Sequence, residues 1–157
     1  MTQLQTSDLN KVTEILQSQG NANLLVENFS PLTGGCINEA GKLSTTRGDF
    51  FLKWNDNTRY PGMFQVEAKG LALLAKANAT DTPEVIATDV VDNCQFIVLE
   101  LIEEGRKKSH YWKDLGEQLA WLHMNTAPQF GLDHNNYIGS LPQYNAQKEN
   151  SWVSFFT

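Results

Sequence analysis

Two charged residues in this sequence have the types and the spacing to hold a phosphorylated ligand. Lys53 lies within the short apolar run Phe51-Leu52-Lys53-Trp54, and Glu67 follows fourteen residues later in a stretch with helical periodicity. A lysine inside an otherwise apolar strand costs free energy unless its charge is paired and solvated. Glu67 and a phosphate group would compensate that charge. The spacing leaves room for a loop and a first helical turn between the two residues.

A pair of glycines precedes the lysine. Gly34 and Gly35 follow Pro31, and the stretch 31–35 is expected to break regular structure, because glycine permits backbone angles closed to other residues. In the kinase-like fold, a turn covers the nucleotide phosphates with backbone N–H groups. The following strand carries a lysine for the α- and β-phosphates, and the next helix carries the glutamate that pairs with this lysine. The order of these elements in the sequence fits that plan.

Each element alone also has an ordinary structural interpretation. A Gly-Gly pair suits any tight turn. Lys53 suits the solvent-facing position of an alternating strand with Phe51 pointing inward, and Glu67 suits a solvated helix surface. The order and spacing of all three together favour the kinase-like interpretation.

Three helices are expected from apolar periodicity. The first covers 7–19, and the second follows the Pro61-Gly62 turn and extends to about residue 78. After a polar linker, the third covers 110–125. Residues 126–150 are rich in Asn, Gln, Pro and Gly and are expected to form an ordered loop or short turns. The apolar stripe of the first helix comprises Leu9, Val12, Ile15 and Leu16.

Short runs of β-branched and aromatic residues, separated by turn signals, predict strands. Thr46-Arg47-Gly48 suits a tight hairpin turn, and Asp92-Asn93 suits a second one. Helices and hairpins together indicate an α+β fold. The expected strands cover 24–29, 37–44, 49–54, 84–87, 90–91 and 95–101.

The composition excludes several classes of protein. The 157 residues carry 12 Lys and Arg against 18 Asp and Glu, a formal net charge of −6 that disfavours nucleic acid as a partner. Hydrophobic residues make up 41%, which excludes a disordered or low-complexity chain. No apolar run approaches the roughly 18 residues of a membrane span, and the N-terminus lacks signal-peptide features. We therefore expect a cytoplasmic protein with no membrane partner.

Several longer blocks of the sequence follow one another in a characteristic order. They are TGGCINEA at 33–40, FLKWN at 51–55, MFQVEAKGL at 63–71, LGEQLAWLH at 115–123, and a stretch from Phe130 through Asn136-Tyr137-Ile138-Gly139 to Trp152. Together they resemble the fructosamine kinase (ketosamine-3-kinase) family, which is related to aminoglycoside phosphotransferases. The resemblance implies a protein-kinase-like small lobe with an antiparallel sheet and helix, plus the first helical part of the large lobe.

The resemblance also implies an activity for the whole protein. The family phosphorylates the sugar part of ketosamines at the 3-hydroxyl, using ATP and Mg²⁺. Its product is unstable and releases the amine, so the family acts in protein-deglycation repair. The expected partners are ATP and either small ketosamines, such as fructosamines and ribulosamines, or glycated protein lysines.

Individual residues gain expected roles from the same resemblance. Lys53 would hold the nucleotide phosphates, and Glu67 would orient Lys53. Gly34 and Gly35 would let the turn approach the phosphates. Leu99-Glu100-Leu101 falls where the inter-lobe hinge of the family contacts adenine through backbone groups. The ordinary alternative for these three residues is the end of a core strand.

One expected element is missing from the sequence. The family's His-Gly-Asp catalytic loop and its metal-binding Asn and Asp lie farther along the chain, and none of His110, His123 and His134 begins such a loop. We therefore expect no catalytic or metal-binding residue here and no turnover by this chain alone. The expected division is a nucleotide-binding lobe over 1–101 and the linker and start of the large lobe over 102–157. The alternatives are another small-molecule kinase, with an aminoglycoside- or choline-like acceptor, or a non-catalytic nucleotide-binding module.

The two cysteines have different expected roles. Cys36 follows Gly35, where backbone N–H groups and Lys53 would favour the thiolate. Some members of the family carry a redox-sensitive cysteine at this position, so a disulfide-linked homodimer is one expectation and an inert turn residue is the alternative. Cys94, beside a hairpin turn, is expected to be buried and inert.

Overall fold

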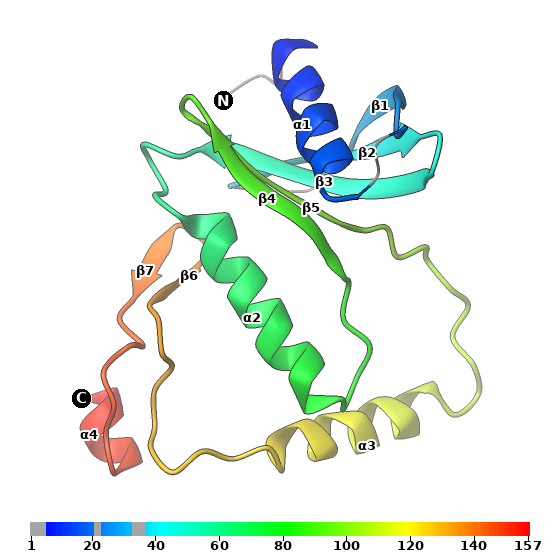
Figure 1. The fold of residues 1–157 in the computed structure, drawn as a ribbon. Coiled ribbons are helices and arrows are strands. Elements are labelled where there is room, and N and C mark those ends of the chain that lie inside the picture. The colour runs from blue at the N-terminus through cyan, green and yellow to red at the C-terminus, as the bar shows by residue number, and fades with distance from the viewer. Residues whose placement is uncertain (1–5, 21–22, 33–36) are drawn as a thin grey trace. The chain divides into compact units, whose positions relative to one another are not determined.

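The largest element of the protein is a five-stranded antiparallel sheet. The computed structural model describes residues 6–20, 23–32 and 37–157. The strand order is β1-β2-β3-β5-β4, so β3 lies in the middle of the sheet between β2 and β5 (Figure 1). The strands are β1 (Val26–Leu32), β2 (Glu39–Thr45), β3 (Gly48–Asp56), β4 (Val85–Val91) and β5 (Cys94–Glu100).

Helices and a second, smaller hairpin complete the described part of the chain. Two compact units are present, one of Met1–Ala68 and Pro83–Glu103, which holds the sheet, and one of Lys69–Thr82 and Glu104–Thr157. No helix among the described residues has both the length and the apolar character to cross a membrane. The further elements are α1 (Thr6–Ser18), α2 (Met63–Ala77), α3 (Tyr111–His123), β6 (Asn136–Ile138), β7 (Leu141–Gln143) and α4 (Trp152–Phe156).

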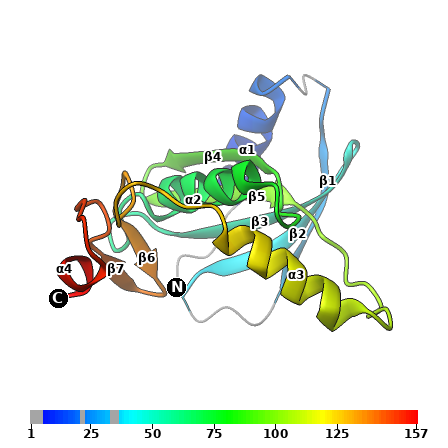
Figure 2. The same cartoon turned by 90° about the horizontal axis from the view of Figure 1, so that it is seen from below.

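The two faces of the five-stranded sheet meet different helices. α1 covers one face, and the first turns of α2 lie on the other (Figures 1 and 2). Val12 and Leu16 of α1 are fully buried against the sheet, with Leu9 and Ile15 partly buried beside them. The apolar stripe predicted for the first helix is thereby confirmed. The core cluster comprises Val12, Leu16, Leu24, Leu43, Leu52, Trp54, Ala87, Cys94, Phe96 and Val98.

Strand β3 alternates between these two faces. Leu52 and Trp54 belong to the core cluster on the α1 side, so Phe51 and Lys53 lie on the opposite face. The interpretation that set an inward Phe51 against a solvent-facing Lys53 is therefore wrong, because residues two apart on a strand share a face. Lys53 instead projects on the side where α2 begins.

Both predicted hairpin turns are confirmed. Between β2 and β3, Gly48 has a φ of 110°, and the Thr45 hydroxyl donates a hydrogen bond to its carbonyl oxygen at 2.7 Å. Between β4 and β5, Asp92 has a φ of 53° in a two-residue turn. The sequence indicates two separate strands before this turn, over 84–87 and 90–91. In the structure both segments belong to the single strand β4. Its pairing with β5 shifts register between Val85 and Ala87, and the residues from Ala87 to Val91 then pair continuously with β5.

The expected break in regular structure at Pro31 is wrong. β1 continues through Pro31 to Leu32, and Pro31 lies opposite Gly41 in the register with β2. β1 is an edge strand, and such strands tolerate proline because the N–H positions on their outer side have no partner strand. Gly41 leaves space for the ring of Phe29, since a Cβ at residue 41 would lie 2.2 Å from that ring.

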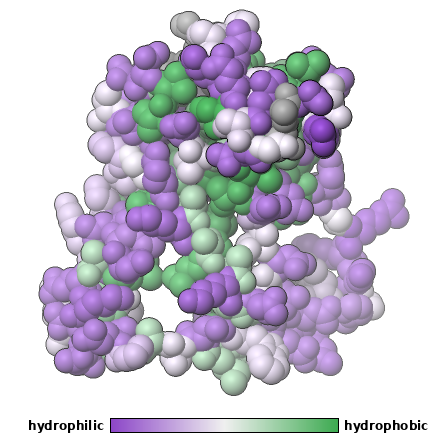
Figure 3. Space-filling view, in the orientation of Figure 1, coloured by the Kyte–Doolittle hydropathy of each residue, from purple (hydrophilic) through white to green (hydrophobic). Residues whose placement is uncertain are grey.

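The second unit contains more regular structure than its composition indicates. α3 agrees with the helix predicted over 110–125 to within two residues at each end. The stretch 126–150, expected as ordered loop or short turns, contains the β6–β7 hairpin. α4 follows, and the hydroxyl of Ser151 caps it by accepting a hydrogen bond from the Ser154 N–H at 3.1 Å. The surface over β6, β7 and α4 is mostly hydrophilic in Figure 3, as expected from the many Asn and Gln residues.

Cys94 is buried, as the sequence predicts. Its side chain belongs to the core cluster. Burial, together with the nearby carboxylates of Asp8, Asp56 and Glu39, raises the pKa of the Cys94 thiol from 9.0 to about 11. The neutral thiol is therefore the form that the fold stabilises.

The raised pKa of Cys94 predicts a loss of stability at alkaline pH. Because folding favours the protonated thiol, its contribution is complete below pH 9 and is lost as the pH rises from 9 to about 11. We expect the difference in unfolding free energy between the wild type and Cys94→Ala to shrink across that interval, since the variant lacks the titrating group. Urea denaturation of both proteins at several pH values measures this difference. A constant difference would contradict a buried neutral thiol.

Gly131 is a position where only glycine fits. Its φ is 103°, and an added Cβ would lie 2.2 Å from the backbone oxygen of Gln147. We expect Gly131→Ala to lower the unfolding free energy by at least about 2 kcal/mol, because it combines backbone strain with a clash against another main chain. Gly116→Ala is the matched control, because a Cβ there meets open space in the middle of α3. It should leave stability unchanged or raise it by about 0.5–1 kcal/mol. Equal thermal unfolding of the two variants would refute the assignment.

Candidate functional site

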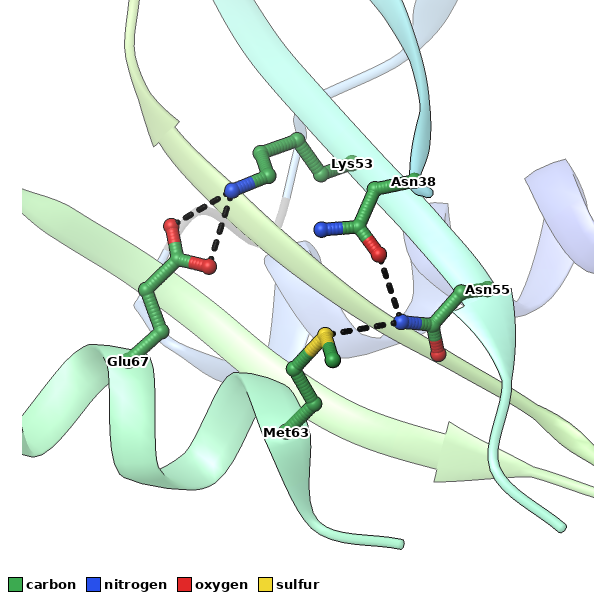
Figure 4. Close-up of polar contacts among 5 residues, drawn as sticks. All are labelled: Asn38, Lys53, Asn55, Met63 and Glu67. Atoms are coloured by element: carbon green, nitrogen blue, oxygen red, sulfur yellow. Dashed lines mark hydrogen bonds and ion pairs between the residues drawn. The ribbon is translucent and has the colours of Figure 1, made fainter. Parts of the chain in front are cut away.

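Lys53 and Glu67 form a close ion pair on the α2 side of the sheet. The Nζ of Lys53 lies 2.7 Å and 2.8 Å from the two carboxylate oxygens of Glu67 (Figure 4). The two side chains are 20% and 29% exposed, so they are shielded but still reach solvent. Contact with both oxygens fixes the ammonium in one place. The structure therefore brings together the two charged residues that the sequence singles out.

The local fold explains why these two residues meet. The alternation of β3 places Lys53 on the face opposite the core cluster. Phe64, in the first turn of α2, is fully buried and anchors the helix against that face, and its ring lies 5.5 Å from the Lys53 Nζ. Glu67 follows Phe64 by three residues, which places it on the same side of the helix. The apolar anchor thus brings the carboxylate to the lysine.

Beside this pair lies a set of polar side chains whose role the sequence does not indicate. Asn55 follows Lys53 by two residues on β3, and its Nδ2 donates to Asn38 Oδ1 at 2.7 Å and to Met63 Sδ at 3.2 Å (Figure 4). The Nε2 of Gln95 on β5 donates to Asn55 Oδ1 at 2.6 Å and to the carbonyl oxygen of Tyr60. The sequence places Asn55 on the same strand face as Lys53, two residues further along, but only its pairing with Gln95 shows that it belongs to a buried network.

The residues expected at the hinge lie at the end of β5. Leu99 is buried within the sheet, opposite Phe51 and Val85. The backbone N–H of Glu100 donates to the carbonyl oxygen of Glu84 at 2.9 Å, and the Glu84 N–H donates to the Glu100 carboxylate. Leu101 follows the last residue of the strand. The Leu99 side chain therefore packs within the sheet, and the chain leaves the sheet at Leu101.

Three of the expected site residues lie outside the described part of the chain. They are Gly34, Gly35 and Cys36. Strand β2, which follows this stretch, begins at Glu39 and pairs with β3 so that Ala40 lies opposite Lys53. The phosphate-turn role of the glycines and the redox role of the cysteine stay predictions.

Polar residues of the second unit bond to neighbouring parts of their own loop. The Asn135 Oδ1 accepts a hydrogen bond from the Ala146 N–H at 2.9 Å, and Asn145 Nδ2 donates to Asn136 Oδ1 at 2.7 Å. The hydrogen bond from His134 lowers the pKa of the Asp133 carboxyl. Across the described ranges, no group of three or more His, Cys, Asp or Glu side chains could hold a metal ion.

The Lys53–Glu67 pair has a definite chemical capacity. Lys53 presents a positive charge whose position is fixed from one side by Glu67, and an ammonium of this kind can neutralise phosphate oxygens. The geometry therefore suits holding and orienting a phosphorylated ligand.

Comparison with known proteins gives a consistent family. The fructosamine kinase family model matches residues 8–157. A protein of Synechocystis named "Probable ketoamine kinase" is 34% identical over 144 residues, which cover 91% of this chain and 48% of that protein. The chloroplastic protein-ribulosamine 3-kinase of Arabidopsis thaliana is 30% identical over 148 residues, covering 92% of this chain and 44% of its own length. The chain thus spans about half the length of these curated relatives.

A solved structure supports the same assignment. The crystal structure of a Haemophilus somnus protein described as "Putative fructosamine-3-kinase" superposes with a TM-score of 0.84 at 29% sequence identity. The match covers 92% of this chain and 49% of that one. The predicted α+β, protein-kinase-like fold is thereby confirmed. Because the family model also covers almost the entire chain, this protein belongs to the fructosamine kinase family.

Proposed function

We propose that the chain binds ATP through Lys53, with Glu67 holding the lysine in position. The observation that carries this proposal is the contact of the Lys53 Nζ with both oxygens of Glu67, at 2.7 Å and 2.8 Å, within the small-lobe fold of a kinase family. In kinases, this lysine contacts the α- and β-phosphates and the helix glutamate orients it. Gly34 and Gly35 would cover the phosphates from the preceding turn, and the backbone of Leu99–Leu101 would contact adenine where the chain leaves the sheet after Glu100.

The whole protein, we infer, transfers the γ-phosphoryl group of ATP to the 3-hydroxyl of a ketosamine. The names of the relatives, ketoamine kinase and protein-ribulosamine 3-kinase, support this class of acceptor. Bound Mg²⁺ would neutralise charge on the transferring phosphoryl group. The residues of this chain have a narrower task, which is to bind the nucleotide and orient its phosphates. Small ketosamines and glycated protein lysines are the acceptors to test, and deglycation is the outcome that such a reaction would serve.

Loss of the lysine should weaken nucleotide binding. We expect Lys53→Ala in the full-length protein to raise the dissociation constant for Mg-ATP by about tenfold or more, because it removes a charge-assisted contact to phosphate. Isothermal titration calorimetry measures the effect. Lys42→Ala is the matched control, because Lys42 is also a strand lysine paired with a carboxylate, that of Asp49, but its partner lies on the neighbouring strand. Unchanged affinity in Lys53→Ala would sink the proposed role, and equal weakening in both variants would show a general charge effect.

The acceptor class can be tested on the whole protein. We expect the full-length protein to release ADP with a fructose-lysine or ribulose-lysine analogue in a coupled assay, and the 157-residue chain to release none. Kanamycin and choline serve as comparison acceptors, because kinases of the same fold can act on such amines. ADP release with kanamycin or choline alone would replace the ketosamine assignment. Turnover by the 157-residue chain would contradict the view that the catalytic loop lies outside it.

A further inference from the structure

Two amide side chains are buried beside the Lys53–Glu67 pair. Gln95 is fully buried and Asn55 is 5% exposed, although both are polar residues of a sheet. Burying an amide costs free energy unless its donors and acceptors are bonded. The register of the sheet brings these two together, since Asn55 lies directly opposite Gln95 in the pairing of β3 with β5. Their burial therefore needs an explanation from the contacts that they make.

The N–H groups of both amides are fully used. Gln95 Nε2 donates one hydrogen bond to Asn55 Oδ1, at 2.6 Å, and the other to the carbonyl oxygen of Tyr60. Asn55 Nδ2 donates one to Asn38 Oδ1, at 2.7 Å, and the other to Met63 Sδ, at 3.2 Å. Because Gln95 faces two acceptors, its nitrogen has to occupy this position, and the oxygen of Asn55 has to point toward it. The orientation of Asn55 is thus set by Gln95.

The contacts of Asn55 and Lys53 repeat at matching intervals along the strand and the helix. Asn55 follows Lys53 by two residues on β3, which is about 6.7 Å along a strand. Met63 precedes Glu67 by four residues on α2, which is about 6 Å along a helix and returns to the same helix face. Lys53 therefore contacts Glu67, and Asn55 contacts Met63, as two successive cross-links between the same strand and the same helix (Figure 4).

We propose that Asn55, oriented by Gln95, is a positioning residue for the Lys53–Glu67 pair. This inference rests on the proposed nucleotide site. Phe64 anchors the first turn of α2, and the two cross-links one helical turn apart add to it by limiting both the rotation of the helix and its position along β3. Gln95 adds a third constraint by holding the carbonyl oxygen of Tyr60, in the turn that leads into α2. The Glu67 carboxylate is thereby held where it meets the lysine.

The test is the effect of Asn55→Leu on nucleotide affinity in the full-length protein. Leucine is similar in size but can neither accept from Gln95 nor donate to Met63 and Asn38. We expect the dissociation constant for Mg-ATP to rise about tenfold, the scale set by loss of buried hydrogen bonds. Thr88→Val is the matched control. Thr88 lies opposite Ile97, which in turn lies opposite Lys53, so Thr88 is on the same sheet face as Lys53 and Asn55. Its buried hydroxyl has no hydrogen-bond partner, so removing that hydroxyl should leave nucleotide affinity unchanged.

A double-mutant cycle separates positioning from a general structural effect. If Asn55 acts through Glu67, Asn55→Leu should lower affinity about tenfold in the wild type but less than about twofold in a Glu67→Gln background. An equal loss in both backgrounds would overturn the inference, as would unchanged affinity in a folded Asn55→Leu protein. Gln95→Met, which removes the donor that orients Asn55, replaces Asn55→Leu in the cycle if that variant does not fold. With Gln95→Met, an equal loss of affinity in both backgrounds, or unchanged affinity in the folded variant, would likewise overturn the inference.

The proposed function and this inference fail in different ways. Unchanged affinity in Lys53→Ala removes the nucleotide site itself, and the positioning role falls with it. A loss in Lys53→Ala with no loss in Asn55→Leu leaves the nucleotide site intact and removes only the positioning role. Measuring both variants with the same nucleotide therefore distinguishes the two failures.

Discussion

The site depends on one electrostatic requirement, which is that a lysine ammonium be held without being fully buried. Exposed ion pairs contribute about 0–1 kcal/mol, and full burial carries a desolvation penalty that pairing repays only with good geometry. At 20% and 29% exposure, Lys53 and Glu67 lie between these limits. The pair is therefore a weak source of stability and a good means of orientation. A phosphate could approach the same ammonium from the solvent side, and the fold needs to supply only the fixed geometry.

The fold can hold polar side chains in this geometry because the two faces of the sheet differ in composition. On the α1 side, Leu52 and Trp54 join a continuous apolar cluster that stabilises the strands. On the α2 side, the same strand presents Lys53 and Asn55 to a helix. A buried polar network is costly when partly satisfied. Here the N–H groups of Gln95 and Asn55 all find acceptors, whereas the buried Gln95 Oε1 has no hydrogen-bond partner. Because the apolar face stabilises the sheet, the opposite face can carry the polar contacts that hold Lys53 and Asn55 in position.

The sequence alone predicts the ion pair but not its supports. Lys53 is conspicuous because it interrupts an apolar run, and the periodicity around Glu67 indicates a helix. Asn55 reads only as a polar strand end, since its importance depends on Gln95, forty residues away, and only the pairing register of β3 with β5 brings the two opposite each other. The error at Pro31 has a similar origin, because whether a proline ends a strand depends on whether that strand lies at the edge of the sheet. Local patterns carry no such information.

The proposed nucleotide site is not where one acceptor sugar would be distinguished from another. In the proposed site, Lys53 would contact the phosphates of the nucleotide and not the acceptor, so the pair would not distinguish one sugar from another. The relatives named for ketoamines and for ribulosamines align with this chain at 34% and 30% identity, over the segment that holds the pair. Selectivity among acceptors would then come from side chains that touch the sugar. In the proposed site, nucleotide affinity would depend on Lys53, Glu67 and their amide supports, whereas acceptor preference would depend on a different set of residues, so the two properties could be varied independently.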